Sequence, residues 1–76
     1  MPHIIIKLIP GRSEKMKMNL AKQIAEDVSK GLNIEMGYVS VAFEEVDGEL
    51  WREQVYKKEI KDNSNVYIQP DHKFFE

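Results

Sequence analysis

The sequence contains no cysteine, which excludes disulfide bonds and cysteine-based zinc sites. It also has no basic excess: 13 acidic residues outnumber 11 Lys and Arg residues, and the net charge is −2. Electrostatic binding of nucleic acid needs a basic face, so this balance argues against a nucleic-acid partner. The two histidines, His3 and His72, are too far apart in the chain to suggest a metal site, and we expect no metal.

Long hydrophobic runs are absent as well. The apolar run at residues 4–9 contains Lys7 and is too short for a membrane span or a signal peptide, so we expect a cytoplasmic protein without a membrane partner. The chain has room for one domain, residues 1–76, whose core stabilises the fold by only about 3–5 kcal/mol. Since no disulfide can add to this, we expect the chain to form an oligomer.

The sequence does contain alternating strand and helix patterns. Residues 3–9 are rich in β-branched side chains and predict a strand that is apolar on both faces. Residues 14–30 repeat an apolar side chain every four positions, which predicts a helix. Ser13 is the expected N-cap of this helix and Gly31 its expected left-handed C-cap residue. Residues 38–46 alternate between the two sheet faces, which predicts a second strand.

Together these patterns predict an α/β (α+β) fold, a βαβ unit with parallel strands and a right-handed crossover. One helix cannot cover both faces of such a sheet, so a second subunit is expected to continue the sheet or cover its open face. After the turn signal at residues 47–48, a short second helix is predicted over about residues 49–58, with a hairpin as the alternative. Residues 66–69 predict a short C-terminal strand, and the phenylalanines at 74–75 are expected to dock on a surface.

The chemistry is predicted at the start of the chain. Pro2 follows the initiator methionine, which aminopeptidases remove before small residues, and removal would leave a secondary amine. A free α-amino group titrates near pH 8, roughly where a general base works well. Arg12, beside a helix N-terminus, can bind a carboxylate through two hydrogen bonds, although an arginine in a turn is more often a surface residue. Trp51 is the sole tryptophan and can wall a small pocket or serve the core.

These residues resemble the 4-oxalocrotonate tautomerase family. The resemblance rests on Pro2, the turn at residues 11–13, the long helix and the second strand at residues 39–43, and it extends to about Trp51. It implies a cofactor-independent tautomerase, an isomerase of the intramolecular oxidoreductase type, acting on small carboxylic acids such as 2-hydroxydienoates or phenylpyruvate-like enols. It further implies Pro2 as the general base, Arg12 as the carboxylate anchor and Trp51 as the pocket wall.

One position departs from the family pattern. The second-strand arginine that polarises the substrate carbonyl falls on Ser40, a neutral donor. Arg52 or a residue of a partner chain would then supply the missing charge, or the chemistry is weaker or has another substrate. The chain continues beyond Trp51 as in the dimeric bacterial members, which implies a homodimer rather than a hexamer. His3 lies on the opposite pleat from Pro2 and is expected to serve the subunit interface.

The sequence also fits two alternative functions. Ser40 favours a non-catalytic homodimer or a module that binds small carboxylates. A hydratase or dehalogenase of the same family would use Glu53 to activate water, but such members add arginines where this chain has Leu8 and Ile9.

Overall fold

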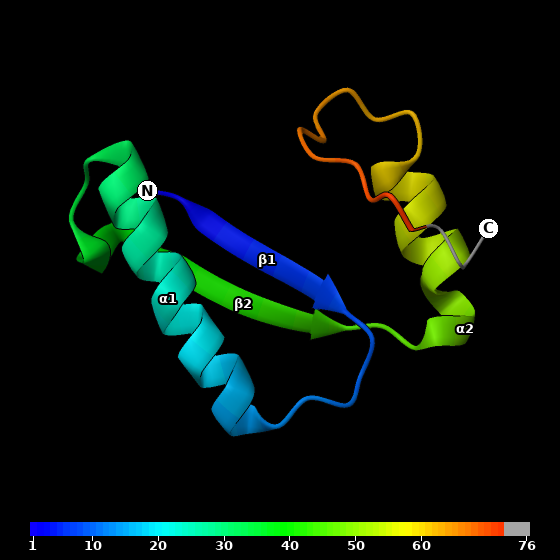
Figure 1. The fold of residues 1–76 in the computed structure, drawn as a ribbon, viewed down its shortest axis with the longest axis horizontal. Helices are drawn as coiled ribbons and strands as arrows, with labels where there is room; N and C mark the ends of the chain where they lie inside the picture. Colours follow the sequence, from blue (N-terminus) through cyan, green and yellow to red (C-terminus); the bar gives the residue numbers. More distant parts are fainter. Residues whose placement is uncertain (73–76) are drawn as a thin grey trace.

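The computed structural model describes residues 1–72 and arranges them as a βαβ unit followed by a helical segment (Figure 1). The elements of this part are strand β1 (His3–Leu8), helix α1 (Glu14–Leu32), 3-10 turn η1 (Met36–Tyr38), strand β2 (Ser40–Glu45), helix α2 (Gly48–Trp51) and π-helix η2 (Arg52–Ile60). The two strands pair in parallel, with His3 opposite Ser40 and Leu8 opposite Glu45. The predicted parallel βαβ unit is therefore confirmed.

Helix α1 begins where the sequence predicts. Ser13 has an extended backbone, and its hydroxyl accepts a hydrogen bond from the Met16 N–H at 3.2 Å. This bond satisfies one of the N–H groups that the first turn of a helix leaves without a partner. Glu14 places a negative charge in the same turn, where the helix dipole favours it.

The other end of α1 corrects the prediction for Gly31. The residue in the left-handed conformation is Asn33, with a φ of 56°, and Gly31 lies inside the helix. The Asn33 N–H donates to the Lys30 carbonyl at 3.3 Å. The Ile34 N–H donates to the Ser29 carbonyl at 3.0 Å. These two bonds form a Schellman cap, and asparagine accepts the left-handed conformation well enough to take the role predicted for glycine.

The pleat gives the sheet two different faces. Helix α1 lies on the face that carries the side chains of Ile4, Ile6, Leu8, Val41 and Phe43. The opposite face is exposed over three side chains, His3, Ile5 and Ser40, and we call these three residues the open face. The C-terminal helical segment approaches this second face around Ile5, Lys7 and Glu44, where the two together line a cavity.

The chain after β2 turns into helix, not into a hairpin. Helix α2 begins at Gly48 and continues directly into η2, which confirms the predicted second helix. The Lys61 N–H donates to the Tyr56 carbonyl at 2.8 Å, five residues earlier, so the helix is wide at its end. Val55 and Tyr56 of η2 are each 4% exposed and are the buried residues of the described chain.

The predicted strand at residues 66–69 is wrong, because the described chain has no strand after β2. Turn hydrogen bonds occupy this segment instead. The Asn65 N–H donates to the Asn63 side chain at 2.9 Å, and the Val66 N–H donates to the Asn63 carbonyl at 3.1 Å. Such local bonds compete with pairing into a sheet. The expected docking of residues 74–75 lies outside the described residues.

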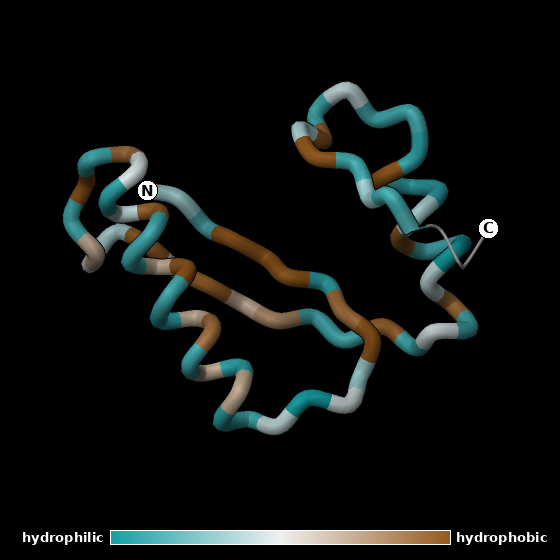
Figure 2. Tube along the Cα trace, viewed as in Figure 1, coloured by the Kyte–Doolittle hydropathy of each residue, from teal (hydrophilic) through white to brown (hydrophobic). Residues whose placement is uncertain are grey.

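Much apolar surface stays in contact with solvent. Figure 2 shows apolar stretches along both strands, yet no residue of β1, β2 or α1 is fully buried. Ile5 on the open face is 52% exposed, and the apolar side chains Met16, Met18, Leu20 and Tyr38 are also exposed. Exposed apolar side chains that gather in one patch often mark an interaction surface.

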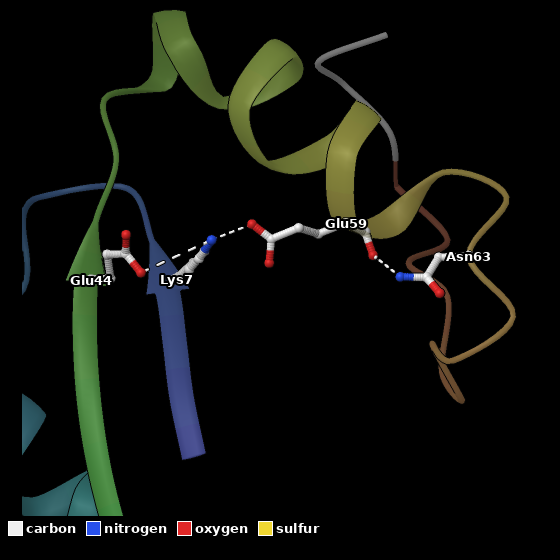
Figure 3. Close-up of polar contacts among 4 residues, drawn as sticks. All are labelled: Lys7, Glu44, Glu59 and Asn63. Carbon is white, nitrogen blue, oxygen red and sulfur yellow. Dashed lines mark hydrogen bonds and ion pairs between the residues drawn. The ribbon is translucent and has the colours of Figure 1, made fainter. Parts of the chain in front are cut away.

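One ionic cluster joins the helical segment to the sheet (Figure 3). The Lys7 ammonium contacts the Glu59 carboxylate of η2 and lies 4.0 Å from the Glu44 carboxylate of β2. The Asn63 side chain donates to the Glu59 carbonyl at 2.7 Å. The hydrogen bond to Glu59 raises the pKa of Lys7, burial partly opposes this, and the charges of Glu44 and Glu59 add to the rise.

We predict that Ser13→Ala lowers the free energy of unfolding by about 1 kcal/mol, because the first turn of α1 loses its cap. Ser13→Asp should keep most of the stability, since its carboxylate can accept the same bond. Urea unfolding at one fixed protein concentration measures both. Ser64→Ala, in an exposed loop, is the control. Equal stability of Ser13→Ala and the wild type would contradict the cap.

We also predict that Lys7 stabilises the fold in a pH-dependent way. Its folded-state pKa is raised above 10.5, so its contribution is fully present below that pH and is lost as the pH rises through the folded-state value. The stability difference between the wild type and Lys7→Met should therefore shrink above pH 10.5. Thermal unfolding across this range tests it, with Lys58→Met as the control. A difference that does not change with pH would exclude the charge as the cause.

Candidate active site

Pro2 is built into the sheet, although it lies next to the chain end. Its carbonyl accepts a hydrogen bond from the Ser40 N–H at 3.2 Å. This bond follows from the register, because β1 and β2 start side by side with His3 opposite Ser40. The structure therefore brings together two of the predicted site residues, Pro2 and Ser40.

His3 joins the same place through its side chain. Its Nδ1 lies 2.6 Å from the Ser40 hydroxyl oxygen, a hydrogen bond across the open face. The sequence predicts only an interface role for His3 and does not predict this contact. The register of the two strands could have predicted the contact, because in-register residues of neighbouring parallel strands lie on the same face of the sheet.

Arg12 lies at the other end of β1, beyond Leu8. Gly11, with a φ of 137°, turns the chain there toward α1. Arg12 lines a cavity of about 290 Å³, together with Leu8, Met16, Lys17, Leu20 and Phe43. Within residues 1–72 the Arg12 side chain has no hydrogen bond or ion pair. A free guanidinium beside apolar side chains suits a carboxylate that carries an apolar group.

Lys17, the other cation of this cavity, is already neutralised. Its ammonium lies 2.8 Å from the Glu14 carboxylate and 3.5 Å from the Glu45 carboxylate. The hydrogen bond to Glu14 raises the pKa of Lys17, and burial partly opposes this rise. Arg12 is therefore the cation of this cavity that remains for an anionic ligand.

Trp51 and Arg52 follow the end of β2. Trp51 lines a second cavity, of about 410 Å³, with Ile5, Lys7, Glu44, Val55, Glu59 and Ile60. Arg52 is exposed at the start of η2. The neighbouring Glu53 lies 2.9 Å from the Lys57 ammonium, and the hydrogen bond to Lys57 lowers the pKa of Glu53.

The predicted residues thus fall into two groups at opposite ends of the sheet. Strand β1 is six residues long. At a rise of 3.3 Å per residue, it separates His3 from Leu8 by about 17 Å. Pro2 and Ser40 lie at one end, whereas Arg12, Trp51 and Arg52 follow the carboxyl ends of the strands (Figure 1). A single chain does not bring the two groups together.

The described residues offer neither a metal site nor a membrane-spanning helix. Within residues 1–72, no three His, Asp or Glu side chains gather closely enough to hold a metal ion. None of the helices in this part combines the length and the apolar character that crossing a membrane requires.

Comparisons with known proteins agree on one family. Residues 2–59 match the family model described as tautomerase enzyme. A probable tautomerase of Xylella fastidiosa (strain 9a5c) is 41% identical over 61 residues, which are 80% of this chain and 74% of that protein. Tautomerase PptA of Enterobacter sp. (strain 638) is 39% identical over 61 residues, 79% of this chain and 80% of that protein.

A solved structure shows the same fold. The crystal structure of apo unfused 4-OT superimposes with a TM-score of 0.62 over 64% of this chain and 80% of that one, at 24% sequence identity. The chain belongs to the tautomerase family, as its resemblance to the 4-oxalocrotonate tautomerases predicted.

Proposed function

We propose that the protein is a cofactor-independent tautomerase, an isomerase of the intramolecular oxidoreductase type, in which the nitrogen of Pro2 is the general base. The observation that carries this proposal is the hydrogen bond from the Ser40 N–H to the Pro2 carbonyl, which holds Pro2 at a fixed place in the sheet. Met1 is 92% exposed, so an aminopeptidase can reach the bond that must be cut to free the Pro2 nitrogen. Membership in the tautomerase family supports the same reaction class.

The reaction relocates a single proton. The neutral Pro2 amine takes the proton from the hydroxyl of an enol or a 2-hydroxydienoate, and the electron pair of that O–H bond forms the carbonyl. The electrons of the carbon–carbon double bond then take up the proton from the protonated amine. Atoms and electrons balance without an oxidant or a reductant. The Arg12 guanidinium binds the substrate carboxylate, and holding the substrate in position contributes several kcal/mol to catalysis, roughly 7 or more in favourable cases.

We further propose that the complete site forms in a homodimer, with Arg12, Trp51 and Arg52 of the partner subunit beside Pro2. The separation of about 17 Å along β1 argues for this, because one chain cannot bring its own Arg12 to its own Pro2. The exposed apolar side chain of Ile5 and the free guanidinium of Arg12 are both explained by a second copy. The helical segment after Trp51, which resembles the dimeric members, favours a dimer over a hexamer.

A module that binds small carboxylates is the second candidate, and Ser40 in place of an arginine favours it. Such a module would bind the acid without isomerising it. A hydratase or dehalogenase is less well supported, because the Glu53 carboxylate that would activate water is paired with Lys57.

We predict that the protein converts phenylenolpyruvate to its keto form only when Met1 has been removed. Retention of Met1 should abolish turnover, because an amide nitrogen is not basic. Pro2→Ala should lower kcat about 100-fold or more, the usual contribution of a positioned base. Intact mass defines the processing state, absorbance follows ketonisation, and Pro70→Ala is the control proline variant. Unchanged turnover in Pro2→Ala would exclude the proline mechanism, and binding without turnover by the processed wild type would favour the carboxylate-binding module.

We also predict that two inactive variants complement each other. A mixed dimer of Pro2→Ala and Arg12→Ala subunits has one site with both native residues, provided that the partner supplies Arg12. Such a dimer, isolated with two different affinity tags, should have about half of the wild-type activity. Each variant alone, carrying the same tags, is the control. A mixed dimer as inactive as its parents would place Pro2 and Arg12 of one site in the same chain.

A further inference from the structure

The family resemblance places a carbonyl-polarising arginine at the position of Ser40. The hydrogen bond between His3 and Ser40 indicates how a serine can take that role. We propose that His3 is a positioning residue that directs the Ser40 hydroxyl to donate its proton to the carbonyl oxygen of the substrate. The pair would take the role that the family resemblance assigns to a second-strand arginine. This inference rests on the proposed function, and its test includes a measurement that does not depend on turnover.

The first support is the place of the pair. Ser40 donates its backbone N–H to the Pro2 carbonyl at 3.2 Å, so Ser40 lies beside Pro2 at the start of the sheet. His3 is the next residue after Pro2 and the in-register partner of Ser40. Their side chains lie on the open face, which α1 does not cover, so a substrate can approach the hydroxyl.

The second support is the number of protons that the pair can share. A serine hydroxyl has one proton to donate and two lone pairs to accept with. His3 Nδ1 lies 2.6 Å from the hydroxyl oxygen, so one of the two groups must donate to the other. If Nδ1 carries the proton, His3 donates and the serine proton is free to point at a ligand. If Nδ1 carries no proton, the serine gives its proton to His3 and has none left for the substrate.

The third support is electrostatic. Within residues 1–72, His3 forms no ion pair with a carboxylate, so no carboxylate competes with Ser40 for its ring. A hydroxyl whose oxygen accepts a hydrogen bond is itself polarised and becomes a stronger donor. An Nδ1–H group on His3 would therefore polarise the Ser40 hydroxyl toward the carbonyl oxygen of the substrate. A neutral hydroxyl on its own lacks this effect.

Kinetics of five variants test the pair. Ser40→Ala and His3→Leu should each lower kcat for phenylenolpyruvate about 100-fold, the usual loss for one donor to a developing oxyanion. The double variant should be no slower than either single one, because both remove the same interaction. Ser40→Thr keeps a hydroxyl and His3→Asn keeps an amide near the position of Nδ1, so both should recover most of the loss. Additive losses, or a His3→Asn variant as slow as His3→Leu, would overturn the proposal.

A competitive inhibitor separates this role from a merely structural one. 3-Phenylpropanoate keeps the carboxylate and the ring but lacks the carbonyl oxygen. Its inhibition constant should be unchanged in Ser40→Ala and His3→Leu, whereas loss of the folded site would weaken it. His72→Gln, which changes the other histidine, is the control and should leave both kcat and the inhibition constant unchanged. An equal weakening of inhibitor binding and of kcat would assign His3 a structural role only.

Nitrogen-15 NMR of His3 in the processed protein gives an answer without turnover. In a His72→Gln background, the chemical shift of Nδ1 shows whether that nitrogen carries a proton. We expect a protonated Nδ1 in the wild type, with a coupling or shift that changes in Ser40→Ala. An unprotonated Nδ1 would overturn the proposal even if the enzyme is active. A protonated Nδ1 in a protein that has no tautomerase activity would instead contradict the proposed function while leaving the arrangement of the pair intact.

Discussion

Parallel pairing of β1 with β2 is the constraint from which the rest of the structure follows. Parallel strands cannot be joined by a tight hairpin, so α1 forms the crossover connection between β1 and β2. That helix covers one face of the sheet, and the helical segment after β2 approaches the other face around Ile5, Lys7 and Glu44. Within residues 1–72, Val55 and Tyr56 are therefore the buried residues, and Ile5 is half exposed. A sheet of this kind is stable when something else lies against it, and a second copy is the simplest candidate.

The same pairing decides where the predicted site residues lie. Because the strands start together, the residues that begin them, Pro2 and His3 on one and Ser40 on the other, share one end of the sheet. Because they also end together, the arginine and the tryptophan that follow them share the opposite end. Under the proposed function, the length of β1 means that the Pro2 end of one chain would need the Arg12 end of a neighbouring chain.

Local patterns in the sequence were enough to predict β1, α1, β2 and the second helix, because periodicity and the Ser13 cap act over a few residues. They failed where two residues compete for one role or where distant residues meet. Gly31 and Asn33 can both adopt the left-handed conformation. The backbone hydrogen bonds of the cap form with Asn33 in that conformation. The strand predicted at residues 66–69 does not form, because Asn63 makes turn hydrogen bonds with residues 65–66. The contacts of His3 with Ser40 and of Lys7 with Glu59 join residues far apart in the chain, so periodicity alone could not reveal them.

The hydrogen bond on the Pro2 carbonyl has a consequence for maturation. Chain ends are usually the most poorly ordered part of a domain, yet here the residue next to the end is already a rung of the sheet. Cleavage after Met1 would then convert the Pro2 amide nitrogen to an amine without any movement of the backbone. An inert folded precursor and a competent enzyme would share one architecture and differ by a single peptide bond. Competence would be acquired once, irreversibly, by trimming a folded protein, and it would need no conformational transition.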